Sequence, residues 1–284
     1  MTSPLPSRIA ITGGAGNLGR KLTAALLADP ACTRVLILDP AAESVAADRR
    51  VVPVVADLRS REAGWTGALA EADAIVHLAA ENPYPGATWA EAARSFDMTA
   101  NVLEAAAASG VRRFVFASSN HVMGGYKDTA IADTPGALTT ALDPLAGTHT
   151  KTTDSTEYAT AKLMGERLLA AKARSDGMTG VSLRIGWCQP GENHPETINL
   201  SGLPGVEDTV SSEEERRELR WFQRMWLSNG DFVRAVTAAL RADAAAWPAP
   251  AVVVNAVSGN DRTPWDLTTA ATLIGYTPAD GFRP

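Results

Sequence analysis

Short apolar segments alternate with longer alanine- and leucine-rich segments along most of this chain, and this alternation constrains its fold more than any other feature. The short segments are rich in β-branched residues and apolar throughout, which is typical of strands in a parallel sheet covered on both faces. The expected strands are residues 8–12, 35–39, 51–57, 74–79, 114–118 and 181–185, and the expected helices between them are residues 17–29, 60–72, 88–109 and 155–175. Such alternation predicts an α/β fold with a doubly wound parallel sheet.

The second half of the chain is less regular. Residues 126–154 and 189–212 are rich in Thr, Asp, Gly and Pro, so we expect loops that extend from the scaffold. We expect helices at 213–227, 230–243 and 265–275 and a strand at 252–257. The pattern predicts a larger domain, residues 1–186, with the inserted loop 126–154, and a small C-terminal cap, residues 187–284, interleaved with it.

Composition excludes several classes of protein. Among 284 residues the chain has 26 basic and 32 acidic side chains, and its net charge of −6 argues against binding nucleic acid. No apolar run approaches the roughly 18–20 residues of a membrane-spanning helix. The first residues, MTSPLPSR, lack the charged and apolar regions of a signal peptide, and the two cysteines and four histidines show no metal-ligand spacing. We expect a cytoplasmic protein with no metal site and no membrane partner.

Glycines gather where the first expected strand meets the first expected helix. The segment TGGAGNLG, residues 12–19, contains Gly13, Gly16 and Gly19. In such a turn, glycines let the backbone approach a pyrophosphate and let the helix pack closely on the sheet. The helix then begins at Asn17 and Leu18 and points its amides and its positive dipole end at the phosphates. We therefore expect a dinucleotide-binding turn of the Rossmann type.

An acidic residue ends the next expected strand. Asp39 follows the glycine-rich turn at the distance at which a carboxylate accepts the ribose hydroxyls of an adenosine. A carboxylate here repels the 2′-phosphate of NADP, and Pro40 supplies no positive charge to offset it, so the sequence favours NAD as the cofactor. Asp57 and Leu58 end the third expected strand, where they can reach the adenine, although an ordinary strand-end role for Asp57 stays open.

A tyrosine and a lysine lie one helical turn apart after the fifth expected strand. Tyr158 and Lys162 therefore share a face of their helix. A tyrosine phenol has an ordinary pKa of about 10, and a neighbouring ammonium stabilises the phenolate, so the phenol can accept a proton from an alcohol. Ser118 and Ser119 end the fifth strand at the carboxyl edge of the sheet, where ligands of this fold bind. One of these hydroxyls can hold the substrate oxygen beside Tyr158.

Together these segments resemble the extended short-chain dehydrogenase/reductase superfamily over essentially the whole chain. The resemblance rests on TGGAGNLG (12–19), Asp39, Asp57 with Leu58, HLAA (77–80), FVFASSNHVMG (114–124) and YATAK (158–162). Within the superfamily the chain looks most like the uronate dehydrogenases, which oxidise the C1 hydroxyl of hexuronic acids with NAD to a lactone. That similarity rests on the Ser-Ser-Asn-His sequence at 118–121 and on residues 184–188 and 226–232.

The resemblance implies a role for each matching position. Tyr158 is implied to be the general base, Lys162 to lower its pKa and bind the nicotinamide ribose, and Ser119 to hydrogen-bond the reacting hydroxyl. The implied substrate contacts are Asn82, Ser119, Asn120, His121, Trp187, Arg220 and Arg224. The implied cofactor contacts are Gly13, Gly16, Asn17, Leu18, Gly19, Asp39, Asp57, Leu58, Leu78, Ala79, Tyr158, Lys162 and Cys188. Residues 1–186 would bind NAD, residues 187–284 the substrate, and the protein would be a homo-oligomer.

Several departures from that group concern the substrate end. Trp187 stands where the group has a small hydroxyl residue that touches the substrate. Arg220 and Arg224 flank, without occupying, the position of the group's carboxylate-binding arginine, so a role for either in binding a substrate anion stays open. The segments at 126–154 and 189–220 are longer than is typical of the group. Hydride chemistry therefore has more support than a uronate substrate.

Three functions follow from these observations. The leading hypothesis is an NAD-dependent oxidoreductase of a sugar or sugar-acid hydroxyl, similar to uronate dehydrogenase. The alternatives are a nucleotide-sugar epimerase or dehydratase that retains its NAD, and a dinucleotide-sensing regulator without catalysis. Regulators of this kind usually lack the Tyr and Lys pair. A chain of 284 residues leaves only a small cap beyond the NAD-binding half, which favours a free sugar over a nucleotide-linked one.

Overall fold

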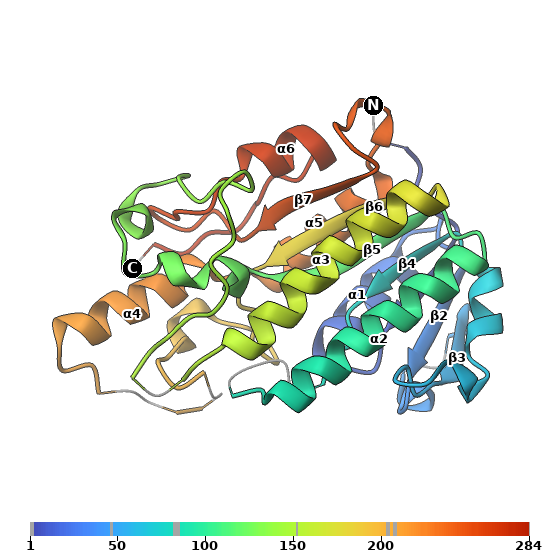
Figure 1. The fold of residues 1–284 in the computed structure, drawn as a ribbon, viewed down its shortest axis with the longest axis horizontal. Coiled ribbons are helices and arrows are strands. Elements are labelled where there is room, and N and C mark those ends of the chain that lie inside the picture. Colours follow the sequence, from blue (N-terminus) through green and yellow to red (C-terminus); the bar gives the residue numbers. More distant parts are fainter. Residues whose placement is uncertain are drawn as a thin grey trace.

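The structure, a computed structural model, describes residues 3–45, 48–81, 86–151, 153–202, 205–206 and 209–283. Its strands form one seven-stranded sheet in which all neighbouring strands are parallel (Figure 1). The strands are β1 (Arg8–Thr12), β2 (Arg34–Asp39), β3 (Val51–Val55), β4 (Ala74–His77), β5 (Arg113–Ser119), β6 (Thr179–Ile185) and β7 (Ala251–Ala256). The α-helices are α1 (Asn17–Ala28), α2 (Trp89–Ala108), α3 (Thr156–Asp176), α4 (Glu213–Arg224), α5 (Asn229–Arg241) and α6 (Thr268–Ile274).

The order of the strands positions the site. Neighbours run β3-β2-β1-β4-β5-β6-β7, so the chain winds outward from β1 to β3 and then crosses back to place β4 on the other side of β1. In open α/β sheets, ligands bind outside the carboxyl ends of the strands at such a reversal. The predicted Rossmann-type, doubly wound α/β sheet is confirmed.

Each face of the sheet is covered by its own apolar cluster. Ile9 and Ile11 of β1 pack with residues of α1, α5 and α6, whereas Ala10 packs on the other side with residues of α2 and α3. Figure 1 shows α2 and α3 crossing in front of the sheet. Because both faces are buried, strand residues are apolar at successive positions rather than at alternate ones.

A third apolar cluster joins the segments outside the sheet. Trp221 and Phe222 of α4 pack with Met123, which lies in the 3₁₀ helix Asn120–Tyr126, and with Trp265 near the C-terminus. The rings of Trp221 and Trp265 have their centroids 4.7 Å apart. Figure 1 shows α4 and the green segments that follow β5 at the same end of the molecule. The C-terminal region also contributes β7 and α6 to the sheet and its covering layer.

One predicted helix has a different form. Residues 60–72 form two 3₁₀ helices, Arg61–Ala63 and Thr66–Glu71, instead of one α-helix. Gly64 lies between them with a φ of 79°, and this left-handed conformation ends the first helix. The other predicted strands and helices occur within a few residues of their expected limits.

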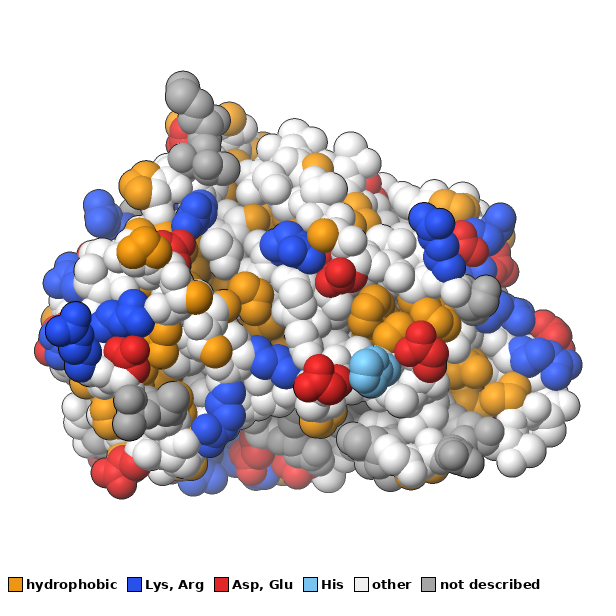
Figure 2. Space-filling model, turned by 180° about the vertical axis from the view of Figure 1, so that it is seen from behind, with side chains coloured by type: hydrophobic (Ala, Val, Ile, Leu, Met, Phe, Trp, Pro, Cys, Tyr) orange, Lys and Arg blue, Asp and Glu red, His pale blue; other side chains and the backbone are white. Residues whose placement is uncertain are grey.

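On the face shown in Figure 2, lysine and arginine side chains are interspersed with aspartate and glutamate, and no basic stripe crosses that face. Within the described ranges, no helix combines the length and the apolar character that crossing a membrane requires.

Candidate active site

A cavity of about 810 Å³ opens at the carboxyl ends of the strands. Its walls come mainly from the segments that follow β1 to β6, together with α1 and α3. The residues expected at the site that line this cavity are Gly13, Gly16, Asn17, Leu18, Gly19, Asp39, Asp57, Leu58, Leu78, Ala79, Ser119, His121, Tyr158, Lys162, Trp187 and Cys188. The fold therefore brings the glycine-rich turn, the acidic strand ends and the Ser, Tyr and Lys residues to one hollow.

The glycine-rich turn has the shape that close approach to a phosphate needs. Gly13 has a φ of 68°, and a Cβ there would lie 2.8 Å from the amide nitrogen of Ala79. A Cβ on Gly19 would lie 2.5 Å from the carbonyl oxygen of Gly13, so only glycine lets α1 pack this closely. Gly16 occupies the N-cap of α1, and therefore no capping side chain competes with an anion for the first amides.

Two carboxylates lie near the start of the cavity. Asp39 accepts hydrogen bonds from the backbone amides of Ala15 at 3.2 Å and Ala41 at 2.8 Å, which hold its carboxylate beside the turn. Asp57 pairs with Arg59 at 2.7 Å, and the hydrogen bonds from Arg59 lower the pKa of this carboxyl. The residues present therefore fit a dinucleotide, with amides for the phosphates and Asp39 for the ribose.

Burial controls the titration of Lys162 and Tyr158. The Lys162 ammonium donates to the carbonyl oxygen of Ala117 at 2.7 Å and lies 5.7 Å from the centroid of the Tyr158 ring. Removal from water lowers the pKa of Lys162 to about 8. It also raises the pKa of Tyr158 to about 12, which a hydrogen bond with Ser119 partly offsets. The pKa of Tyr158 therefore lies above its ordinary value, opposite to the decrease expected from Lys162.

The two adjacent serines have different environments. Ser118 donates to Glu166 Oε1 at 2.5 Å, and Glu166 also accepts two hydrogen bonds from Arg184, each of 2.9 Å. Both charged side chains of this pair are buried. Ser118 is thus committed to the interior, whereas Ser119 lines the cavity and hydrogen-bonds Tyr158.

His77 has a structural position. Its Nδ1 lies 2.6 Å from the Thr12 hydroxyl, and its Nε2 lies 3.0 Å from the Thr99 hydroxyl. The side chain is fully buried, and desolvation lowers its pKa to about 3, so the ring is neutral. It links β1, β4 and α2 behind the loop that carries Leu78 and Ala79.

His121 and Asn120 begin the 3₁₀ helix that follows β5. His121 lines the cavity, and its ring contacts that of Tyr158 edge-on with centroids 6.0 Å apart. Burial lowers the pKa of His121 to about 4. Asn120 is fully buried, does not line the cavity, and both polar atoms of its amide lack a hydrogen-bond partner among the described residues.

The remaining expected substrate contacts are more scattered. Trp187 lines the cavity, packs edge-on against Phe222 with centroids 4.9 Å apart, and forms a parallel bridge with Trp226. The helix α4 ends at Arg224 instead of reaching the expected residue 227, so Trp226 lies outside the helix and is available for this bridge. Arg220 and Arg224 do not line the cavity. Asn82 lies outside the described residues.

Several residues of the cavity wall are absent from the sequence-based expectations, among them Glu81 and Met225. Glu81 directly follows the HLAA segment, so extending the expectation for Leu78 and Ala79 along the loop would have found it. Its carboxylate forms an ion pair with Arg94. Met225 follows α4 and reaches the cavity only through the packing of that helix, for which the sequence offers no local signal.

Comparison with known proteins agrees with this geometry. A model of the NAD dependent epimerase/dehydratase family matches residues 9–254, most of the chain. The chain belongs to this family. The predicted superfamily and the predicted NAD cofactor are thereby confirmed.

Relatives match over nearly the full length. An L-arabinose 1-dehydrogenase (NAD(P)(+)) of Haloferax volcanii is 34% identical, with 96% of this chain and 97% of the relative covered. An NAD-dependent glucose-6-phosphate dehydrogenase of the same organism is 28% identical, with 96% and 93% covered. The crystal structure of a uronate dehydrogenase from Agrobacterium tumefaciens has a TM-score of 0.66 at 26% identity, with 97% of this chain and 85% of that chain covered. The chain is an NAD-dependent oxidoreductase that acts on a CH–OH group.

Proposed function

We propose that this enzyme oxidises the C1 hydroxyl of a free, uncharged sugar with NAD and releases a lactone. The relatives that match nearly the whole chain are, by their names, dehydrogenases of L-arabinose, glucose 6-phosphate and uronate. The first of these substrates is neutral, and the other two carry a phosphate or a carboxylate. The charge of the cavity is the observation that carries our choice between them.

Positive charge is scarce in the cavity. Of the 26 lysines and arginines, all of which lie among the described residues, only Arg59 and Lys162 line it. Arg59 is paired with Asp57, and Lys162 is held beside the catalytic tyrosine. The acidic residues that line the cavity are Asp39, Asp57 and Glu81. A substrate carboxylate or phosphate would therefore lose its hydration without gaining a counter-charge.

The two arginines that could have supplied that charge have other partners. Arg220 pairs with Glu213 at 2.9 Å. Arg224 pairs with Asp133 at 2.8 Å and also donates to the carbonyl oxygen of Ala132. These contacts support a neutral substrate over the uronate that the sequence resemblance favours.

Ser119 and Tyr158 would perform the proton chemistry. The Ser119 hydroxyl orients the C1 hydroxyl of the sugar, and Tyr158 accepts its proton as a hydride leaves C1. NAD, which the glycine-rich turn and Asp39 would hold, would supply the acceptor for that hydride and a positive charge. Because its pKa is about 8, Lys162 stays mostly charged at pH 7 and helps to hold the phenolate. The C1 hydroxyl of a cyclic sugar belongs to a hemiacetal, so loss of a hydride and a proton yields an ester within the ring, a lactone.

Initial rates of NADH formation with a matched pair of sugars test the proposal. D-galactose and D-galacturonate share their ring hydroxyls and differ at C6, where one has a CH₂OH group and the other a carboxylate. We expect kcat/KM to be at least about tenfold higher for the neutral sugar, because an unpaired charge in the cavity is unfavourable. A higher kcat/KM for galacturonate would refute the proposal of a neutral substrate but not the proposal of a sugar dehydrogenase. Absence of net NADH with both sugars and with L-arabinose would refute the proposed reaction.

A further inference from the structure

The inserted segment 126–154 returns to the active site at its end. Thr148 and Ser155 are both fully buried, and their hydroxyl oxygens lie 2.8 Å and 3.3 Å from Nδ1 of His121. The amide of Gly147 donates to the carbonyl oxygen of His121 at 3.0 Å. The end of the insertion thus contacts both the backbone and the ring of a residue that lines the cavity.

A glycine in the 3₁₀ helix lets the end of the insertion approach that helix closely. A Cβ on Gly124 would lie 2.2 Å from the Thr148 hydroxyl oxygen and 2.5 Å from the Gly147 carbonyl oxygen. A side chain at Gly124 would therefore push Thr148 away from His121. Glycine at this position allows the contact between the 3₁₀ helix and the insertion.

The two hydroxyl protons indicate which ring nitrogen of His121 is unprotonated. The Ser155 oxygen already accepts a hydrogen bond from the amide of Thr148 at 2.7 Å, so its own proton must go elsewhere. Among the described residues, Nδ1 of His121 is the one acceptor recorded for either hydroxyl. Buried hydroxyl groups rarely leave their protons unpaired. A proton on Nδ1 would leave both hydroxyl protons without an acceptor. An unprotonated Nδ1 can accept a hydrogen bond from one of the two hydroxyl groups.

We propose that Thr148 and Ser155 are positioning residues that hold His121 as the neutral tautomer protonated on Nε2. That N–H then lies on the ring edge opposite the insertion and donates to a ring or hydroxyl oxygen of the sugar beside Tyr158. This inference rests on the proposed function for the identity of the ligand. In this proposal the insertion fixes the tautomer of His121, so that the ring offers a neutral hydrogen-bond donor to a neutral substrate.

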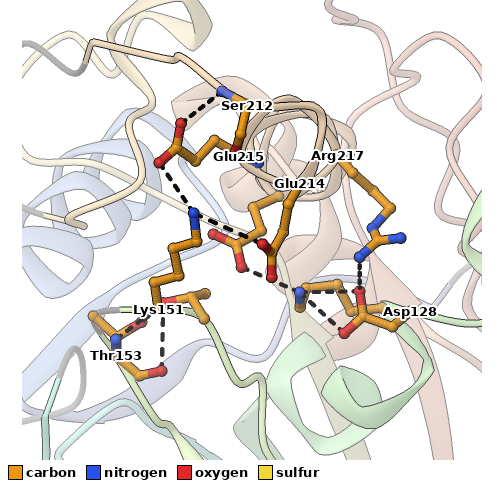
Figure 3. A network of polar contacts seen from close by, with 10 residues as sticks. Asp128, Lys151, Thr153, Ser212, Glu214, Glu215 and Arg217 are labelled. Carbon is orange, nitrogen blue, oxygen red and sulfur yellow. Dashed lines mark hydrogen bonds and ion pairs between the residues drawn. The ribbon is translucent and has the colours of Figure 1, made fainter.

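Besides its contacts with His121, the insertion is attached to α4 (Figure 3). Lys151, at the tip of the loop between Thr148 and Ser155, lies 3.7 Å from Glu214 and 3.4 Å from Glu215 in the first turn of α4. Lys127, directly after the 3₁₀ helix that begins with Asn120 and His121, forms a buried ion pair with Glu218 at 3.4 Å. Both elements that meet at the His121 ring are therefore tied to one helix.

Thr148→Val removes one hydroxyl and keeps the shape of the side chain. We expect it to raise KM for the sugar about tenfold, with kcat and the Kd for NAD nearly unchanged, because it weakens one hydrogen bond that orients the substrate donor. Ser155→Ala should act in the same direction, and Thr148→Ser should restore most of the affinity. Thr134→Val is the matched control, because Thr134 lies in the same insertion with its hydroxyl on the carbonyl of Ala130. An unchanged KM in folded Thr148→Val would overturn the proposal.

The tautomer can be measured without substrate. Long-range ¹H–¹⁵N correlation spectra distinguish a proton on Nδ1 from one on Nε2, and His121→Gln assigns the signal among the four histidines. We expect His121 to be protonated on Nε2 in the wild type and to show mixed tautomers in Thr148→Val. A wild-type ring protonated on Nδ1, or on both nitrogens at pH 7, would refute the proposal. If no sugar is oxidised, the proposed function fails, and this spectrum still decides the positioning role.

Discussion

Burial shifts the pKa values of Tyr158 and Lys162 in opposite directions. The same desolvation that raises the pKa of Tyr158 to about 12 lowers that of Lys162 to about 8. The phenol of Tyr158 is therefore protonated near neutral pH, and about half of the Lys162 ammonium has lost its charge by pH 8. If Tyr158 is the base that we propose, the positive charge of bound NAD would favour its ionisation in the complex in which a hydride can move.

Asp39 allows a test of cofactor choice at one residue. Asp39→Ser removes the negative charge and keeps an oxygen that can accept hydrogen bonds. We expect the ratio of kcat/KM for NADP to that for NAD to rise at least about tenfold, because the 2′-phosphate is no longer repelled. Asp39→Glu, which keeps the charge, is the control and should retain the wild-type preference. An unchanged ratio in Asp39→Ser would show that another group discriminates between the cofactors.

At the scale of elements, β5, α3 and β6 are joined by one buried ion pair. Glu166 of α3 binds Arg184 of β6 and accepts from Ser118 of β5. This triad leaves Ser119 as the serine that faces the cavity and fixes the orientation of the helix that carries Tyr158. We therefore expect this triad to affect the stability of the fold and not substrate binding, because none of its members lines the cavity.

Removal of one partner of this pair should destabilise the protein strongly. Glu166→Gln would leave the Arg184 guanidinium buried without a counter-charge, which lowers the free energy of unfolding by about 3–5 kcal/mol. Urea denaturation followed by circular dichroism measures it. Glu104→Gln breaks the exposed pair with Arg61 and should cost less than about 1 kcal/mol. Equal effects of the two substitutions would mean that burial of the pair is energetically unimportant.

The elements and the cofactor turn could be predicted because their signals are local. Apolar runs mark the strands, and the spacing of Gly13, Gly16 and Gly19 marks the turn. Two kinds of feature could not be predicted. Gly64 interrupts a helix through a φ that the composition of its segment does not reveal. The contacts of His121 with Thr148 and of Arg220 with Glu213 depend on tertiary packing and on the choice among several nearby charges.

At the scale of the whole molecule, two buried neutral histidines link stability to pH. Burial lowers the pKa of His77 to about 3 and that of His121 to about 4. Each binds a proton more readily in the unfolded chain, where the ordinary pKa is about 6.5. The unfolded state therefore gains protons first as the pH falls below 6.5, and the folded state loses stability over this range.

We expect the free energy of unfolding to fall by about 2 kcal/mol per buried histidine between pH 7 and pH 5. Urea denaturation at a series of pH values measures this slope. In His121→Gln the slope should be about half that of the wild type over the same range. A wild-type stability that stays constant from pH 7 to pH 5 would contradict the neutral state of these two rings.

The amount of NADH formed per active site tests the central claim most directly. The wild-type enzyme is mixed with excess NAD and a neutral aldose such as L-arabinose or D-galactose, and the absorbance of NADH is followed to its end, with Tyr158→Phe as the inactive control. Our account predicts many equivalents of NADH per active site, matched by lactone, and a loss of about 10²–10⁴-fold in rate for the variant. NADH that stops at or below one equivalent per active site, as in an enzyme that retains and regenerates its cofactor, would contradict it.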